Sequence, residues 1–206
     1  MTFESPAAMR TAFGKALVHI GETNEDVVAL TADLSEAIRV HWFAEKFPQR
    51  FFQMGISEND MIGTAAGLAL GGKIPFATTF AVFATSLANQ PVRLHLGYSQ
   101  FNVKVVSSHG GVTVGADGAT HQGFEDLALM RLIPGMTVLA PCDANETWKA
   151  THAIAAHKGP VYMRVGRINT PVVTAEDAPF TIGKANVMRD GDDVAILATG
   201  SMVPTA

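Results

Sequence analysis

Short apolar runs alternate with longer segments of helical period along the first 166 residues of the chain. This alternation predicts βαβ units, in which successive strands lie parallel in one sheet and helices connect them. The runs are apolar without strict alternation, which indicates strands that helices bury on both faces. We therefore expect an α/β fold over residues 1–166, with a doubly wound, mostly parallel sheet and helices on both faces. The expected strands are residues 27–34, 50–55, 74–80, 102–110, 136–143 and 161–166.

The intervening segments carry signals for helix boundaries. Ser5-Pro6 predicts the start of the first helix, and Gly21 is expected just past its end. Asp143 and Glu146 have the spacing of a capping box, before a helix expected to end near Gly159.

The composition and periodicity of the sequence change after the last expected strand. Residues 167–191 are poor in helical period and rich in Pro, Thr and Asp, which predicts a linker. Residues 192–206 open with DDVAILATGSM, which is typical of the first strand of another α/β unit. Because a lone strand cannot bury its apolar faces, we expect these residues to be the start of a truncated C-terminal α/β domain.

Composition limits the classes of partner. Apolar residues make up 48% of the 206 positions, enough for a full core, yet no apolar run reaches the ~20 residues of a bilayer span. The N-terminal segment lacks the features of a signal peptide, so we expect a cytoplasmic protein that binds no membrane. The net charge of −4, without a basic stripe, argues against nucleic acid. The single cysteine, Cys142, is expected to be a buried thiol.

An acidic segment spaced by glycines, GISENDMIG, follows the second expected strand. Ser57 and Asp60 fit a helix N-cap and its third residue, and Glu58 by itself is explained by the favourable interaction of a carboxylate with a helix N-terminus. The strand before it, however, delivers Glu58 to the carboxyl edge of the sheet, where α/β folds bind ligands. Three glycines recur every fourth residue and are expected on one helix face that admits close packing of another backbone: Gly63, Gly67 and Gly71.

Aromatic and polar residues are expected at the same edge. Phe80 and Phe83 follow the third strand, and a carboxylate beside aromatic rings suits a polar heteroaromatic ligand, although core packing also explains both rings. The segment SSHGGVTVGADGATHQG then places His109, Asp117 and His121 among glycines that permit sharp turns. The twelve-residue gap between the histidines matches no metal-ligand motif, so we expect no metal site on this chain.

Five motifs occur in the order and at the spacing of one family. GISENDMIGTAAGLAL, TTFAVF, SHGG, GADGATHQG and VYMRVGR resemble the pyrimidine-binding domain of transketolases over about residues 5–170, and DDVAILATGSMVP resembles the opening of their C-terminal domain. Transketolases carry the domain with the magnesium site N-terminal to this region, and nothing in this sequence corresponds to it. The chain thus resembles the C-terminal subunit of a split transketolase.

The resemblance implies thiamine diphosphate as cofactor. Glu58 would hydrogen-bond the pyrimidine ring nitrogen and stabilise the imino tautomer, whose exocyclic nitrogen removes the proton from the thiazolium carbon. Phe80 and Phe83 would pack the pyrimidine ring, and Asp33 in the segment TADLSEA would border the cofactor. Ser86 stands where transketolases commonly carry a further aromatic residue.

The resemblance also implies substrate contacts. His121 would hydrogen-bond the donor sugar and the carbanion intermediate, Asp117 an acceptor hydroxyl, and His109 would lie toward the substrate phosphate. Arg10 and Arg164 would clamp that phosphate, for which guanidinium geometry is suited. Two alternatives concern the phosphate contacts. Arg167 lies three residues from Arg164 and competes with it for the role of phosphate ligand. Ala37 stands where transketolases often have a serine that contacts the phosphate, although Ser35 is close.

The expected function is that of the pyrimidine-side subunit of a transketolase, transferring a two-carbon ketol unit from a ketose phosphate to an aldose phosphate in pentose phosphate metabolism. An N-terminal partner subunit would supply the diphosphate and magnesium site, so that the cofactor is shared across the interface and the chain is active only with its partner. We expect a homodimer of this chain or a heterotetramer. A deoxyxylulose-phosphate synthase-like enzyme, a transketolase for an unusual sugar and a non-catalytic α/β binding module remain as alternatives.

Overall fold

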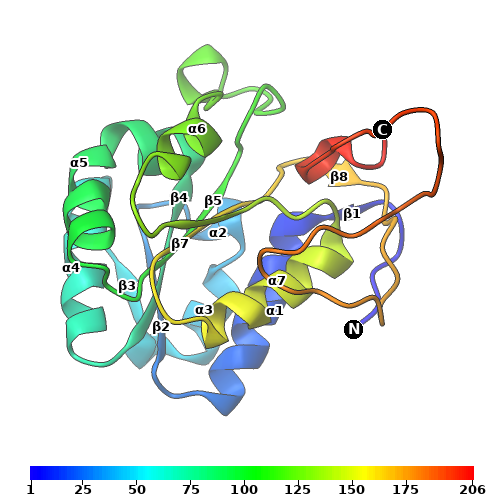
Figure 1. Cartoon of the computed structure of the whole chain (residues 1–206). Helices are drawn as coiled ribbons and strands as arrows, with labels where there is room; N and C mark the ends of the chain where they lie inside the picture. The colour runs from blue at the N-terminus through cyan, green and yellow to red at the C-terminus, as the bar shows by residue number, and fades with distance from the viewer.

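A parallel six-stranded sheet forms the centre of the molecule in the computed structural model, which describes residues 1–206 (Figure 1). Its strands are β2 (Val27–Thr31), β3 (Phe51–Gln53), β4 (Ile74–Phe80), β5 (Lys104–Ser108), β6 (Thr137–Leu139) and β7 (Val161–Arg164). The order is β3-β2-β4-β5-β7-β6, and every pairing is parallel. After β2, the chain adds β3 at one edge of the sheet and then places β4 on the opposite side of β2. The direction of winding therefore reverses between β2 and β4. The predicted doubly wound fold is confirmed, and such a reversal is where α/β folds bind ligands.

Helices cover both faces of the sheet, as Figure 1 shows. Successive residues of β2 point to opposite sides: Val27 belongs to one hydrophobic cluster and Val28 to the other. The first cluster is completed by α1 (Met9–Thr23), α3 (His41–Lys46) and α7 (Ala144–Ala156), and the second by α4 (Glu58–Leu70), α6 (Asp126–Arg131) and the helical segment 83–98. None of the helices has both the length and the apolar character needed to cross a bilayer.

Short elements connect the larger ones. Two π-helices, Phe83–Leu87 and Val92–Tyr98, flank α5 (Asn89–Pro91), and α2 (Ser35–Ile38) follows β2. Three 3₁₀ turns complete the set: Pro48–Arg50, Ala119–His121 and Gly200–Met202.

The expected limits of the first helix are wrong at both ends. Helix α1 begins at Met9, because Ala7–Ala8 form the short strand β1, and it ends at Thr23. Gly21 therefore lies inside the helix. A Cβ at Gly21 would lie 2.7 Å from the rings of both Phe43 and Phe47, so glycine here permits close packing of α3.

The capping box expected before α7 is half formed. Asp143 Oδ1 accepts a hydrogen bond of 2.8 Å from the Glu146 backbone N–H, as the motif predicts. The Glu146 carboxylate instead accepts from the N–H of Cys142, at 2.7 Å. Cys142 is buried, as expected, and burial beside the carboxylate of Glu146 raises the pKa of its thiol.

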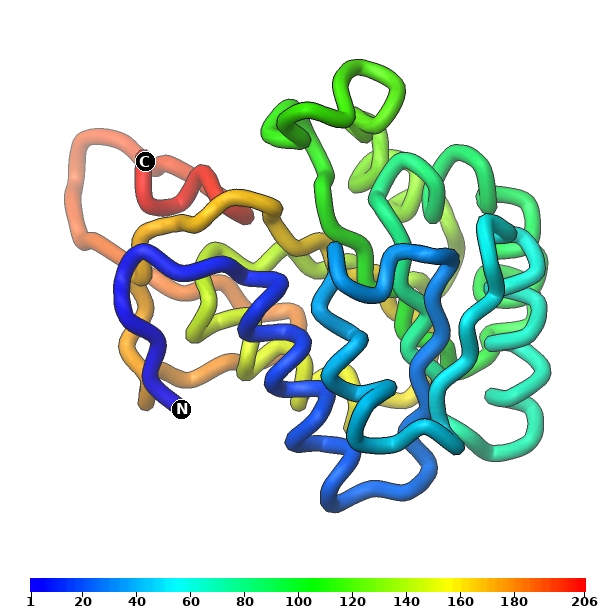
Figure 2. The backbone as a smooth tube through the Cα atoms, turned by 180° about the vertical axis from the view of Figure 1, so that it is seen from behind, coloured from blue at the N-terminus to red at the C-terminus, as the bar shows by residue number.

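The segment after β7 returns to the start of the chain (Figure 2). Strand β8 (Asn169–Thr170) pairs antiparallel with β1. The second carboxylate oxygen of Asp143 accepts hydrogen bonds from the N–H groups of Val173 and Thr174, at 2.8 and 2.7 Å. The first residues of the predicted linker are thus held against the sheet domain. The division into residues 1–166, 167–191 and 192–206 stays a prediction.

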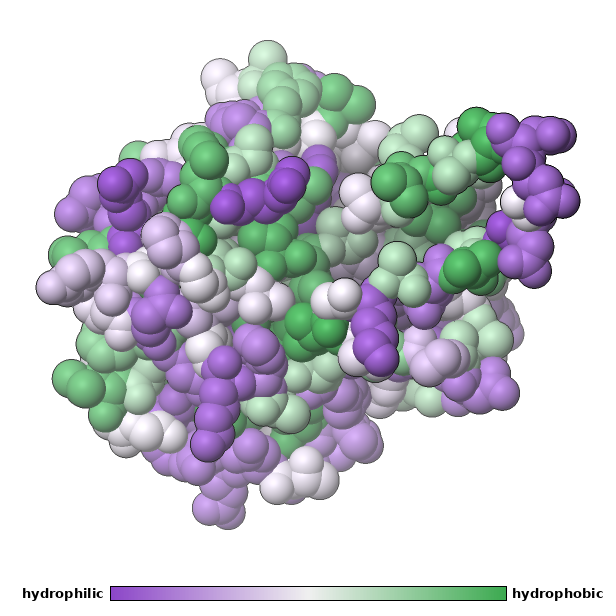
Figure 3. All heavy atoms as spheres, in the orientation of Figure 1, coloured by the Kyte–Doolittle hydropathy of each residue, from purple (hydrophilic) through white to green (hydrophobic).

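The strand expected within residues 192–202 is not formed. Residues 194–199 have no regular structure, and a 3₁₀ turn follows at Gly200. A strand requires a hydrogen-bonded neighbour, and the Gly200 N–H donates instead to the carbonyl of Ala140, at 3.0 Å. The apolar side chains of Ile196 and Leu197 are exposed, and hydrophobic residues gather over this part of the surface in Figure 3.

Candidate active site

The carboxyl ends of β4 and β5 bring the predicted aromatic and histidine residues together. Phe80 ends β4, and His109 follows β5 directly. Their rings stack with centroids 3.9 Å apart. Phe83 lies 6.1 Å from Phe80 with its ring nearly parallel, and His121 approaches Phe83 edge-on at 5.2 Å. Four of the predicted site residues therefore form one cluster of rings.

Glu58 is the first residue of α4 and is 4% exposed. Its Oε1 accepts a hydrogen bond of 3.2 Å from the hydroxyl of Thr79, which is fully buried next to Phe80. Ser57 occupies the N-cap position as predicted, although its side chain makes no capping hydrogen bond. Thr79 was not predicted as a site residue, although a hydroxyl in the residue before Phe80 was a signal for it.

His109 is held in a conformation that few side chains adopt. Its φ of 62° lies in the left-handed region, and its side chain is buried. The hydroxyl of Ser108 lies 2.6 Å from its Nδ1. Burial lowers the pKa of His109 to about 4, helped by the cations Arg10 and Arg167. The imidazole is therefore neutral at pH 7 and carries a proton on only one ring nitrogen.

The loop between His109 and His121 closes on itself. The Gly111 N–H donates a hydrogen bond of 2.7 Å to the carbonyl of Gly123. A Cβ at Gly123 would lie 2.9 Å from the backbone nitrogen of Val82, so glycine lets the loop approach the turn that carries Phe83. This approach brings His121 to the ring cluster. Asp117 lies exposed in the same loop, and its carboxylate raises the pKa of His109, against the lowering effect of burial.

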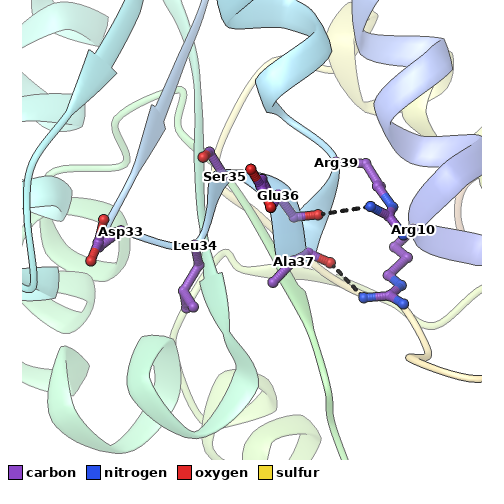
Figure 4. Close-up of a pocket in the computed structure, with 7 residues that line it drawn as sticks. All are labelled: Arg10, Asp33, Leu34, Ser35, Glu36, Ala37 and Arg39. Carbon is purple, nitrogen blue, oxygen red and sulfur yellow. Dashed lines mark hydrogen bonds between the residues drawn. The ribbon is translucent and has the colours of Figure 1, made fainter.

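Arg10 and Asp33 line a neighbouring pocket of about 570 Å³, shown in Figure 4. Arg10 projects from α1, and its Nη1 donates a hydrogen bond of 2.9 Å to the carbonyl of Ala37. Its buried Nε has no partner. Burial, together with the cations Arg39 and Arg167, lowers the pKa of Arg10. Asp33 has a left-handed φ of 57°, and its N–H donates to the side chain of Gln53 at 2.8 Å.

The other two candidate arginines lie against the glycine-rich loop. Arg164 ends β7, and a Cβ at Gly111 would lie 2.6 Å from its Nη2. A Cβ at Gly115 would lie 3.0 Å from Cζ of Arg167. Arg10 and Arg167 both depress the pKa of His109, so two cations act on this imidazole, against the single carboxylate of Asp117. Such an environment favours an anionic ligand.

The residues at the sheet edge fit the pyrimidine end of thiamine diphosphate. An aminopyrimidine ring offers a nitrogen to a carboxylate and a face to a phenyl ring. Glu58 supplies a buried carboxylate one hydrogen bond from Thr79, and the adjacent residue Phe80 stacks in the ring cluster. No cluster of three or more His, Cys, Asp or Glu side chains is arranged to hold a metal ion. The predicted roles of the individual site residues stay predictions.

Comparison with known proteins identifies the fold. The domain family described as the transketolase pyrimidine binding domain matches residues 5–173. The chain is 46% identical over 200 residues to a protein of Methanocaldococcus jannaschii described as a putative transketolase C-terminal section, covering 96% of this chain and 63% of that one. It is 42% identical to the 6-deoxy-6-sulfo-D-fructose transketolase subunit SqwH of Clostridium sp. (strain MSTE9), covering 96% and 62%.

A solved structure leads to the same family. A structure described as a split gene transketolase, inactive beta4 tetramer, superimposes with a TM-score of 0.88 at 46% identity, covering 97% of this chain and 65% of that one. The chain thus spans just under two thirds of the length of each of these three relatives. The resemblance found in the five sequence motifs is confirmed. The chain belongs to the transketolase family and carries its pyrimidine-binding domain.

Proposed function

We propose that this chain is the pyrimidine-side subunit of a thiamine diphosphate-dependent transketolase. It would transfer a two-carbon ketol unit from a ketose phosphate to an aldose phosphate. The observation that carries the proposal is the buried carboxylate of Glu58 at the sheet edge, which accepts a hydrogen bond from Thr79, the residue that precedes Phe80 of the ring cluster.

Each residue of the cluster has a chemical task in this proposal. Thiamine diphosphate, when bound, supplies a nucleophilic carbon that accepts and releases the ketol unit. Glu58 would share a proton with the pyrimidine nitrogen, and Phe80 and Phe83 would pack against the ring. The neutral imidazole of His109 has one N–H to donate to a substrate oxygen, and His121 would do the same from the closed loop.

The proposed partner is a chain that carries the diphosphate and magnesium region. The description of the Methanocaldococcus jannaschii relative as a C-terminal section supports a second section. The description of the solved relative as an inactive tetramer supports activity only in a mixed assembly. Helix α4 offers a surface for association, because a Cβ at Gly63 or Gly67 would meet nothing within 4 Å. Gly71 follows the end of α4, so only the first two of the three glycines lie in the helix.

A second candidate function is a transketolase for an unusual sugar. It is favoured by the 42% identity with a subunit named for 6-deoxy-6-sulfo-D-fructose. A sulfonate and a phosphate are both tetrahedral oxyanions, so Arg10, Arg164 and Arg167 suit either group.

Co-expression with a partner that carries the diphosphate and magnesium region tests the proposal. With thiamine diphosphate and Mg²⁺ added, we expect the pair to transfer ketol units from a pentulose phosphate to an aldose phosphate, and each chain alone to be inactive. Transfer from a sulfonated ketose but not from a pentulose phosphate would favour the second candidate. Deoxyxylulose phosphate formed from pyruvate would instead identify a synthase. A pair that assembles without binding cofactor would contradict the proposal and favour a non-catalytic module.

A further inference from the structure

Gln53 connects the two loops that leave the carboxyl edge of the sheet beside the candidate site. It is the last residue of β3 and lies opposite Thr31, the last residue of β2, in the parallel register. The ladder ends with a hydrogen bond of 2.9 Å from the Met54 N–H to the Thr31 carbonyl. Beyond it, the side-chain oxygen of Gln53 accepts hydrogen bonds from the N–H of Asp33, at 2.8 Å, and of Gly55, at 3.3 Å. One amide oxygen therefore joins the loop after β2 to the loop after β3.

Both donors of these hydrogen bonds have an unusual backbone conformation. Asp33 has a φ of 57° and Gly55 a φ of 67°, so both lie in the left-handed region. That region is strained for a residue with a side chain, and it persists only where the surrounding structure maintains it. At Gly55 a Cβ would meet nothing within 4 Å, so glycine serves the backbone conformation there and not close packing. The hydrogen bonds to Gln53 hold the backbone at both positions.

Each loop carries a residue of the candidate site. Asp33 lines the pocket of about 570 Å³ that Figure 4 shows. The carbonyl of Gly55 accepts a hydrogen bond of 2.9 Å from the N–H of Ser57, and this turn leads directly into α4, which begins at Glu58. The path of the chain at Gly55 therefore limits where α4 can start. Gln53 acts through these loops on a pocket residue and on the helix that presents the buried carboxylate.

We propose that Gln53 is a positioning residue, whose amide oxygen fixes the loops of Asp33 and Glu58 relative to each other for binding of the cofactor. Thr79 holds the carboxylate of Glu58 from β4, and Gln53 holds the loop before it from β3. Loops that are ordered before binding lose less conformational entropy when a ligand binds. The ligand is thiamine diphosphate, so the inference rests on the proposed function and extends it to a residue of β3.

Hydrogen–deuterium exchange of the assembled pair without cofactor tests whether Gln53 holds the two loops. Gln53→Met keeps the length of the side chain and removes the oxygen. Exchange in the peptides that contain Asp33 and Gly55 should become about three- to tenfold faster, the effect of one lost hydrogen bond. Gln53→Glu keeps an oxygen that can accept both bonds, so exchange should stay at the wild-type rate. Unchanged exchange in Gln53→Met would overturn the inference.

Calorimetry with thiamine diphosphate and Mg²⁺ tests the consequence for the site. Gln53→Met in the assembled pair should weaken cofactor binding about fivefold, because binding must then also order the two loops. With saturating cofactor, kcat and the KM of the donor ketose should change less than about twofold. A side chain that only stabilised the fold would lower the Tm without changing the Kd of the folded pair. Faster exchange with an unchanged Kd for the cofactor would therefore also overturn the inference.

Gln49→Met is the matched control, because Gln49 is exposed in the 3₁₀ turn that precedes β3. It should leave the exchange rates, the Kd and kcat unchanged. The proposed function and the inference can fail separately. A wild-type pair that binds the cofactor but transfers no ketol unit contradicts the function, and the Kd of Gln53→Met then still decides the inference. A wild-type pair that binds no cofactor overturns both.

Discussion

The hydroxyl of Thr79 donates a hydrogen bond of 3.2 Å to Oε1 of Glu58, and both side chains are buried. This bond links the end of β4 to the first residue of α4, and it orients the carboxylate proposed to activate the cofactor. Glu58 is the first residue of α4, and Thr79 and Phe80 are the last two residues of β4. The end of β4 therefore carries both the hydrogen-bond donor to the carboxylate and one ring of the cluster.

Replacement of Thr79 by Val keeps the shape of the side chain and removes the donor. We expect the free energy of unfolding to fall by about 1–2 kcal/mol, because a buried carboxylate oxygen loses its partner. Urea denaturation measures the change, and Thr79→Ser is the control, because it keeps the hydroxyl. Equal stability of Thr79→Val and the wild type would show that the hydrogen bond contributes nothing.

Replacement of Glu58 by Gln removes the proposed proton-sharing group without changing its size. Turnover of the assembled pair should fall by about 10²- to 10⁴-fold, the usual contribution of a positioned acid or base. Thermal unfolding and thiamine diphosphate binding should change little. Glu45→Gln, at an exposed position of α3, is the control. Near wild-type turnover in Glu58→Gln would contradict the assignment of Glu58.

His109 should make stability depend on pH in a defined direction. Its pKa is lowered from 6.5 to about 4 in the folded chain, chiefly by burial, so between these values the unfolded chain binds more protons. The free energy of unfolding should therefore rise with pH from about 4 to 6.5, and this slope should be smaller in His109→Asn. Chemical denaturation at several pH values measures the slope, and NMR titration of the imidazole should give a midpoint near pH 4. A midpoint near 6.5 would contradict the neutral imidazole.

Replacement of Gly67 by Ala should separate folding from assembly. Gly67 lies exposed inside α4, and a Cβ there meets nothing within 4 Å. The free chain should become about 0.5–1 kcal/mol more stable, because alanine restricts the unfolded chain more than glycine does. Association with the partner should weaken about tenfold if α4 packs closely in the interface. Gly191→Ala, which also has open space, should not change the affinity measured by calorimetry. Unchanged affinity in Gly67→Ala would exclude this face from the interface.

Much of the fold could be predicted because its signals are local. All six predicted strands exist, and β4 (Ile74–Phe80) has its predicted limits. The predictions failed where a distant contact overrides the local pattern. Gly21 lies inside α1, where the rings of Phe43 and Phe47 occupy the space of a side chain, so it is required for packing and does not end the helix. The apolar run after residue 192 forms no strand, because a strand depends on a neighbour as much as on its own residues.

Individual residues of the candidate site could be predicted from the sequence, but the path of the loop that carries several of them could not. Order and spacing of motifs pointed to Glu58, Phe80 and His109, and the structure places them at one edge of the sheet. Asp117, by contrast, lies exposed in its loop and has only an electrostatic link to His109. A loop rich in glycine has few local preferences, so its path depends on closures such as the one between Gly111 and Gly123.

By itself, the sequence determined the βαβ repeat, the family and the polar residues at the strand ends, because apolar period and motif order are properties of neighbouring residues. Only the tertiary structure decided which side chains support them. Thr79 bonds to Glu58 across 21 positions, and Asp126 bonds to Tyr162 across 36. Lys104, a charged residue in a strand, is fully buried, and the carbonyl groups of His157 and Gly159 accept hydrogen bonds from its Nζ. Such contacts depend on which helix covers which face of the sheet, and that choice is made by packing of the whole domain.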